Sequence, residues 1–232
     1  MMTGLHVGVS GLRAAQMGLY VTGHNMANHN VLGYSRQLLG QAHFIHRNVG
    51  QNANGVMQIG LGTDMTGIRQ VRNHWFDLEY RQAMPALAYW ERRANTHIEL
   101  DAIFGEMEGQ YRLQAALDNL NAALNELNND PASRETRANF ISQAGVFIDR
   151  ANSAARSIFE YQMELNNDVK MKVQRINQII TDIHDLNGRI VEARNFGVVP
   201  NDFMDWRNNL LDELSGMIDI TIIEIPGGSI NI

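Results

Sequence analysis

The sequence predicts a mainly α-helical fold: an elongated antiparallel helical bundle with a small irregular and β-hairpin region, and the start of a β-rich domain at the C-terminus. Apolar residues recur at spacings of three and four over most of the 232 residues, which indicates helices. Short turn sequences separate these stretches, and short turns favour antiparallel neighbours. After residue 217, isoleucines alternate with polar residues, which indicates strands.

The composition restricts the class of protein. Hydrophobic residues make up 44% and charged residues 19% of the chain, which is the balance of a globular protein and not of a disordered one. The formal net charge of −6 argues against nucleic acid as a partner. No apolar run is long enough to cross a bilayer, so we expect no membrane partner. The chain has no cysteine, and disulfides and thiolate metal sites are therefore excluded.

The first helix is predicted over residues 5–29, and its small side chains share one stripe. Gly, Ala and Thr recur at spacings of three and four, and larger apolar residues follow one position later. Each glycine costs about 1 kcal/mol of helix stability relative to alanine. We therefore expect another helix to cover this face. The predicted assembly interface consists of Gly4, Gly8, Gly11, Leu12, Ala15, Gly18, Leu19, Thr22, Asn25 and Asn28.

A polar region and two further helices follow. Residues 41–66 are rich in Gly, Asn and Gln, which predicts irregular chain with short strands at 56–59 and 64–68. A helix is expected over residues 73–104. Pro85 should kink or split that helix, because proline removes a backbone donor. Leucines at three- and four-residue spacing predict a shorter helix over residues 113–127.

The longest helix is predicted from about residue 131 to Arg194. Asp130 is its expected cap, and Pro131 suits its first position. The second half carries an apolar heptad stripe with one polar interruption, Asn187. We interpret this stripe as the inner face of an intrachain bundle, with an intermolecular coiled coil as the alternative. The stripe consists of Val169, Val173, Ile176, Ile180, Ile183, Asn187 and Ile190.

The C-terminal region changes character. A short helix is expected between Asp202, its predicted cap, and Gly216. Beyond it, Pro226-Gly227-Gly228 separates two alternating stretches, which predicts a β-hairpin. Because an isolated hairpin is marginal, we interpret residues 218–232 as the truncated start of a β-rich domain. Residues 1–40 are then an axial helix with its loop, and residues 41–217 form an elongated helical domain.

The histidines suggest a metal-dependent enzyme as an alternative function. His43 and His46 form an HxxH pair, but no glutamate base or third ligand stands at a recognisable spacing. No nucleophile elbow surrounds Ser10 or Ser35. We therefore expect no enzyme, no metal and no cofactor.

Three stretches near the start of the chain carry a family pattern. They are residues 10–16 (SGLRAAQ), 22–28 (TGHNMAN) and 33–37 (GYSRQ). Together they resemble the amino-terminal signature of the bacterial flagellar axial proteins, the family of rod, hook and hook-associated components. Residues 62–70 and 201–215 resemble later blocks of the same family. The chain departs from the family at Met26, His29 and Val31, where isoleucine, alanine and threonine are usual.

The resemblance implies a function and a set of partners. The TGHN and GYSRQ stretches are most similar to the hook-associated members, which implies a structural subunit that joins hook to filament in a ring of identical copies. The implied location is the extracellular flagellum, reached through the type III export apparatus with an export chaperone. Further implied partners are the hook protein and a second junction protein on the filament side. A rod or hook component is the alternative within the family.

Overall fold

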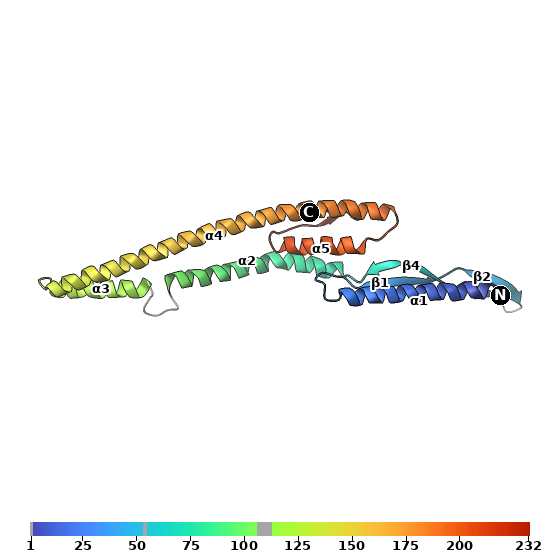
Figure 1. Ribbon diagram of the computed structural model, residues 1–232, viewed down its shortest axis with the longest axis horizontal. Coiled ribbons are helices and arrows are strands. Elements are labelled where there is room, and N and C mark those ends of the chain that lie inside the picture. Colours follow the sequence, from blue (N-terminus) through green and yellow to red (C-terminus); the bar gives the residue numbers. More distant parts are fainter. Residues whose placement is uncertain (1, 53–54, 106–112) are drawn as a thin grey trace. The chain divides into compact units, whose positions relative to one another are not determined.

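A computed structural model describes residues 2–52, 55–105 and 113–232 (Figure 1). Five helices and three antiparallel strand pairs occur within these residues, which confirms the mainly α-helical class. No helix in the described ranges is both long and apolar enough to cross a membrane. The elements are α1 (Met2–Asn28), β1 (Gln37–His43), β2 (His46–Asn52), β3 (Gly55–Gly60), β4 (Thr63–Gln70), α2 (His74–Phe104), α3 (Leu113–Asn129), α4 (Arg134–Asn195), α5 (Asn201–Ser215), β5 (Ile223–Glu224) and β6 (Ile230–Asn231).

The chain divides into two compact units. The first unit combines residues 1–84 with residues 178–232, and the second comprises residues 85–177. Helices α2 and α4 contribute residues to both units. The division of α2 falls at Pro85, and the helix continues through this residue, so of the two predicted effects Pro85 does not split the helix. The residues on both sides of the proline favour helix, and the helix therefore continues although one backbone N–H donor is missing.

In the first unit, two strand pairs follow α1. β1 pairs antiparallel with β4 from Gln37 opposite Gln70 to His43 opposite Thr63, with an irregularity after Gly40. β2 pairs with β3 in the same way. The β1–β4 pair lies along α1 (Figure 1). The predicted strands at 56–59 and 64–68 are confirmed as parts of β3 and β4. β1 and β2 were not predicted, because their glycine- and glutamine-rich sequences carry no alternation of apolar residues.

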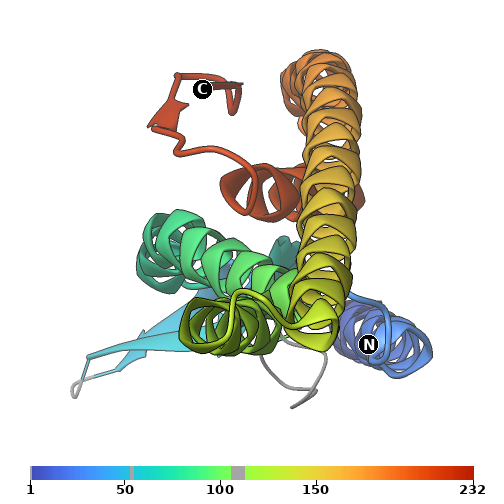
Figure 2. The same ribbon diagram turned by 90° about the vertical axis from the view of Figure 1, so that its left-hand side faces the viewer.

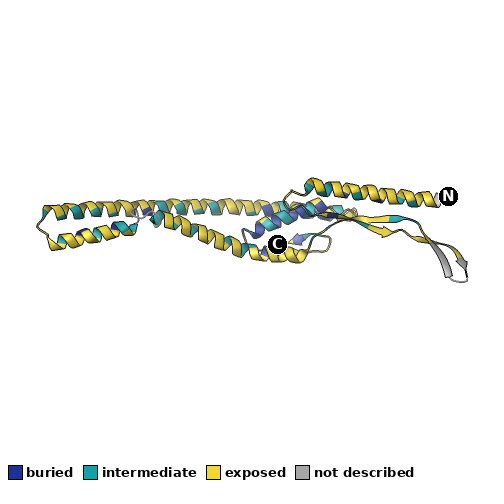
Figure 3. Ribbon diagram, turned by 90° about the horizontal axis from the view of Figure 1, so that it is seen from below, coloured by how far each residue is buried: buried dark blue, intermediate teal, exposed yellow. Residues whose placement is uncertain are grey.

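The core of the first unit joins the C-terminal end of α4 to α5. The buried apolar residues on this part of α4 recur every three or four positions, so they share one helix face, and three leucines of α5 are also buried. Figure 2 shows α5 beside α4, and Figure 3 shows buried residues on α5. Burying each of these side chains contributes about 1.5–3 kcal/mol. The residues are Ile179, Ile183, Leu186 and Ile190 from α4, and Leu210, Leu211 and Leu214 from α5.

The predicted heptad stripe on α4 agrees with this core only at its C-terminal end. Ile183 and Ile190 are buried, whereas Val169, Val173 and Ile180 are 61%, 50% and 48% exposed. The intrachain interpretation is therefore wrong for the first half of the stripe. Since several apolar positions lie side by side on α4, the spacing alone could not decide which of them face a neighbouring helix.

The second unit consists of antiparallel helices. Thr96 of α2 accepts a hydrogen bond from the Tyr161 hydroxyl of α4 (3.1 Å), and Arg92 pairs with Asp168 (2.8 Å). Since the residue numbers rise on one helix and fall on the other, α2 and α4 run in opposite directions. The Asn139 side chain of α4 donates a hydrogen bond to the Glu126 carboxylate of α3 (3.0 Å). The unit therefore has the predicted antiparallel arrangement.

Two of the predicted helix caps are wrong. The Ser133 hydroxyl caps α4, because it accepts hydrogen bonds from the backbone N–H groups of Glu135 (3.2 Å) and Thr136 (3.4 Å). Asp130 instead accepts from the N–H of Ser133 and so orders the turn before the helix. Helix α5 begins after Pro200 without a side-chain cap, and Asp202 lies within its first turn.

The predicted C-terminal hairpin is confirmed. β5 and β6 pair antiparallel, with Glu224 opposite Ile230. Gly227 and Gly228 in the turn have φ values of 97° and 92°, which glycine adopts without steric cost. Ile230 is buried, so the hairpin contributes to the core of the first unit.

Candidate assembly interface

One face of α1 is open. A Cβ atom added to Gly4, Gly8, Gly11 or Gly18 would meet no atom within 4 Å among the described residues. The larger apolar side chains of this helix are also exposed, with Leu12 60% and Leu19 74% accessible. Of the remaining predicted interface residues, Ala15 and Thr22 are exposed, and Gly18 is half-buried. Apart from the half-buried Gly18, the rest of the described chain therefore leaves the predicted small-residue stripe uncovered.

A side of α1 adjacent to the glycine stripe packs on the β1–β4 pair. Ala14 and Val21 are 4% and 5% exposed, at a spacing of seven residues that places them on one side of the helix. The Ser10 hydroxyl donates to the carbonyl of Val7 (2.8 Å) and accepts from the N–H of Thr63 (3.2 Å). The strand pair thus holds one side of α1 and leaves space beside its glycines.

Asn25 and Asn28, which the sequence placed in the assembly interface, have partners within the chain. The Asn25 side chain donates to the carbonyl of Gln37 (2.9 Å) and accepts from the N–H of the same residue (2.9 Å) and from the Tyr34 hydroxyl (2.8 Å). Asn28 donates to the carbonyl of His24 (3.0 Å). Asn25 therefore fixes the loop after α1 and the start of β1.

His24 completes this group. Its Nδ1 atom lies 2.9 Å from the Tyr34 hydroxyl oxygen. Because that hydroxyl gives its proton to Asn25, the oxygen can only accept from His24, and Nδ1 must carry a proton. Burial raises the pKa of Tyr34, and the nearby carboxylates of Asp205 and Asp202 raise it further.

A buried polar cluster joins the same loop to α5 and α2. The N–H of Ser35 donates to Asp205 (3.2 Å), and the Ser35 hydroxyl accepts from Arg72 (3.2 Å). Arg72 also pairs with Asp77 (2.6 Å) and lies 4.0 Å from Asp205. Burial raises the pKa of Asp205, and the hydrogen bonds from Ser35 and the charge of Arg72 offset part of this rise.

A second ion pair holds α2 to α5 directly. Arg81 is 9% exposed, and its Nε lies 2.6 Å from Asp212. The same guanidinium reaches the side chain and carbonyl of Asn208. Sequence reasoning missed these residues because the partners stand 131 positions apart, and only opposite charge on two helices connects them.

Asn187, the predicted polar interruption on α4, holds the C-terminal hairpin. It donates to the carbonyl of Ile230 (2.9 Å) and accepts from the N–H of the same residue (3.3 Å). Arg207 donates both to Asn187 (2.8 Å) and to the carbonyl of Gly228 (2.7 Å). Burial lowers the pKa of Arg207, and the charge of Arg194 adds to the effect.

The histidine pair of the alternative function is divided between strands. His43 ends β1 and His46 begins β2, and these strands belong to different pairs. In the described ranges, no group of three or more His, Cys, Asp or Glu side chains is arranged to hold a metal ion.

Comparison with known proteins places the chain in a family. Residues 98–232 match the family described as the flagellar hook-associated protein FlgK helical domain. Flagellar hook-associated protein 1 of Bacillus subtilis is 26% identical over 221 residues, which are 94% of this chain and 43% of that protein. The proteins of the same name from Salmonella typhimurium and Escherichia coli are 25% and 23% identical over 230 residues, which are 97% of this chain and 40% of each relative.

The two kinds of similarity cover the chain in different ways. The relatives align over nearly all of it, although the chain spans only about two fifths of their length. The family match begins within α2 and continues through α3, α4, α5 and the hairpin, which is more than half of the chain. This chain therefore belongs to the FlgK family of flagellar hook-associated proteins and contains the family's helical domain.

Proposed function

We propose that this chain is part of a structural subunit that joins the flagellar hook to the filament by assembling with copies of itself into a junction ring. Membership of the FlgK family supports a role in the flagellum. The single observation that carries the proposal is the open face of α1, where small and large apolar side chains are exposed together. Exposed apolar faces of this kind mark sites of protein association.

The energetics of α1 favour burial against other helices. Leu5 and Met26 are 71% and 72% exposed, and burying each such side chain contributes about 1.5–3 kcal/mol. The glycines beside them allow the backbones of two helices to approach closely, as small residues do at other helix contacts. We infer that the interface comprises the glycine stripe with Leu12, Ala15, Leu19 and Thr22, while Asn25 orients the helix from within the chain and Asn28 bonds to its own helix.

The proposal includes the partners that the resemblance implies. The hook protein would bind on one side of the ring and a second junction protein on the other. An export chaperone and the type III export apparatus would deliver the subunit to the extracellular end of the hook. The role requires no catalysis, so we propose a protein without enzymatic activity.

Electron microscopy of flagella from a strain that lacks the protein tests the proposal. We expect complete hooks without filaments, and filaments should return when the full-length protein is supplied. A strain that lacks hooks altogether would indicate a rod or hook component instead. Metal bound to the purified protein in stoichiometric amount would favour the metal-dependent alternative.

A further inference from the structure

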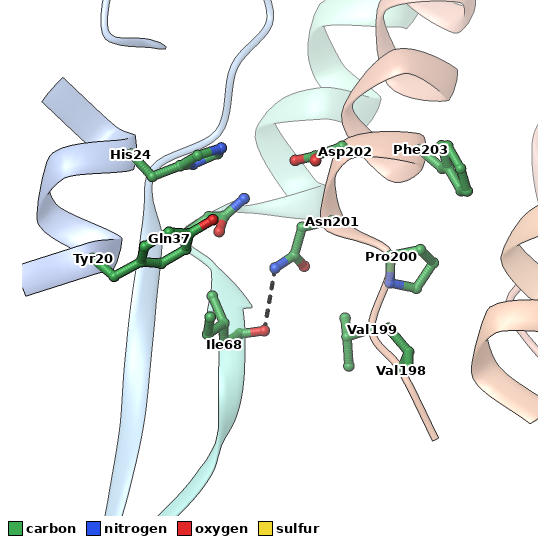
Figure 4. Close-up of a pocket in the computed structure, with 10 residues that line it drawn as sticks. All are labelled: Tyr20, His24, Gln37, Ile68, Val198, Val199, Pro200, Asn201, Asp202 and Phe203. Carbon is green, nitrogen blue, oxygen red and sulfur yellow. Dashed lines mark hydrogen bonds between the residues drawn. The ribbon is translucent and has the colours of Figure 1, made fainter. Parts of the chain in front are cut away.

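Two adjoining hollows lie in the first unit beside the C-terminal end of α1. One has a volume of about 330 Å³ and is lined by α1, by the β1–β4 pair and by the start of α5 (Figure 4). The other has a volume of about 280 Å³ and reaches toward the loop after α1. Both include His24 and Asp202, so together they form one groove, which we term the α1–α5 groove.

Carboxylates and an amide of the groove offer hydrogen-bond acceptors to a ligand. Asp202 is exposed, and its side chain has no hydrogen bond or ion pair within the part of the chain that the structure describes. Asn201 and Asp205, which line the two hollows, are 8% and 6% exposed. The Oδ1 atom of each has no hydrogen-bond partner among the described residues, although Oδ1 of Asp205 lies 4.0 Å from Arg72. A buried acceptor without a donor is costly, so this groove favours a ligand with several N–H groups and positive charge.

The walls of the first hollow suit the stem of a long side chain. Tyr20 and Phe203 contribute aromatic rings, and Val199 contributes an apolar side chain (Figure 4). An arginine combines an apolar stem with a planar guanidinium that stacks on rings and donates up to five hydrogen bonds. The shape and the charge of the groove therefore both favour arginine.

Helix α1 carries one such residue. Arg13 is the only Lys, Arg, Asp or Glu in the sequence of α1, and it is exposed. Its side chain has no hydrogen bond or ion pair in the described ranges. It lies seven residues before Tyr20, about 10 Å along the helix axis. If α1 becomes buried between neighbouring subunits, this guanidinium needs a carboxylate partner, because a buried unpaired charge is strongly unfavourable.

We propose that the α1–α5 groove of one subunit binds Arg13 of a second copy of the chain, with Asp202 as the pairing carboxylate. The inference rests on the proposed function, since it supplies a specific contact for self-assembly. Charge complementarity and the aromatic walls carry the assignment. The negative charge near the groove, which also raises the pKa of Tyr34, is consistent with a cationic ligand.

Asp64 is the competing carboxylate near α1. It lines a separate hollow together with His6 and Ser10. Its carboxylate already accepts a hydrogen bond from the N–H of Met65 (2.9 Å). Since that oxygen is partly satisfied and Arg47, which also lines this hollow, already supplies positive charge there, the α1–α5 groove is the better fit.

A charge-reversal experiment in the full-length protein tests this contact. Arg13→Glu and Asp202→Arg should each lower the amount of subunit in purified hook preparations by about tenfold or more, and the double variant should restore it to within about threefold of wild type. Arg13→Glu combined with Asp64→Arg is the matched control and should not restore assembly. Asp202→Asn, which changes little but the charge, should show the same direction of loss.

Four outcomes would overturn the inference: single variants that assemble normally, a double variant no better than the single ones, rescue by Asp64→Arg, or normal assembly of Asp202→Asn. Circular dichroism and thermal unfolding of each purified variant separate a lost contact from a lost fold. Failure of the groove contact leaves the junction role intact if the deletion strain still shows hooks without filaments. Failure of that strain to show them counts against the proposed function itself.

Discussion

The side chain of Asn25 bonds to both backbone groups of Gln37, as a neighbouring strand would. It donates to the carbonyl and accepts from the N–H, each at 2.9 Å. Gln37 is 7% exposed and is the first residue of β1. One side chain near the end of α1 therefore sets where the strand pair begins, and so fixes the helix against that pair.

The first prediction concerns this contact. Asn25→Ala removes the side-chain partner of both backbone groups of Gln37 and the acceptor of the Tyr34 hydroxyl proton, so we expect a loss of about 1–3 kcal/mol in the free energy of unfolding. Hydrogen exchange at the Gln37 amide should accelerate accordingly. Asn28→Ala is the control, because Asn28 makes one hydrogen bond to its own helix and should cost less. Equal effects of the two substitutions would contradict the role of Asn25.

The second prediction concerns the open face of α1. Gly11→Leu should stabilise the isolated chain by about 1 kcal/mol, since leucine is a better helix former and the site is open. The same substitution should block incorporation into flagella, because the side chain fills the surface on which another helix packs. Gly145→Leu is the matched control on α4, where an added Cβ also meets no described atom within 4 Å. Normal incorporation of Gly11→Leu would remove the glycine stripe from the interface.

The third prediction compares a buried ion pair with an exposed one. Arg81→Met removes one partner of a largely buried pair, so we expect a loss of about 3 kcal/mol in urea unfolding. Arg92→Met removes an exposed pair in which the side chains are 44% and 32% accessible, and its effect should stay below about 1 kcal/mol. A smaller effect at Arg81 than at Arg92 would show that the Arg81–Asp212 pair does not hold α2 to α5.

The fourth prediction concerns the pH dependence of stability. Burial raises the pKa of Asp205 above its ordinary value of 3.8, so the folded chain binds this proton more tightly than the unfolded chain does. The contribution of Asp205 to the free energy of unfolding should therefore fall as pH rises from 3.8 through the raised pKa. Asp205→Asn cannot titrate. The free energy of unfolding in urea, taken as wild type minus Asp205→Asn, should decline across this interval. A flat or rising difference would contradict the raised pKa.

The sequence predicted much of the helical architecture because helix period and turn chemistry are local properties. The extents of α1, α3 and α4 follow from apolar spacing and from the turn residues between them. The hairpin follows from alternating isoleucines around Pro226-Gly227-Gly228. The small-residue stripe on α1 is likewise visible in the sequence, because its spacing of three and four is a local property.

Other features required the tertiary structure. β1 and β2 have no strand pattern of their own and form because each finds a partner strand. The buried face of α4 differs in part from the predicted stripe. Neighbouring faces of this helix are both apolar, and only the position of α5 decides which one is buried. In the sequence, Asn187 is a polar interruption of an apolar heptad pattern. Its two hydrogen bonds to Ile230 form only because the folded hairpin lies beside α4.

The sequence by itself therefore determined the helices, the turns, the small-residue face of α1 and the family, all of which depend on residues close together along the chain. The tertiary structure decided which residues serve as polar partners: Asn25 for Gln37, Asp205 for Ser35 and Arg81 for Asp212. These contacts join residues between 12 and 170 positions apart. Hydrogen bonds and ion pairs depend on distance in space, and no local pattern encodes that distance until the apolar faces have packed.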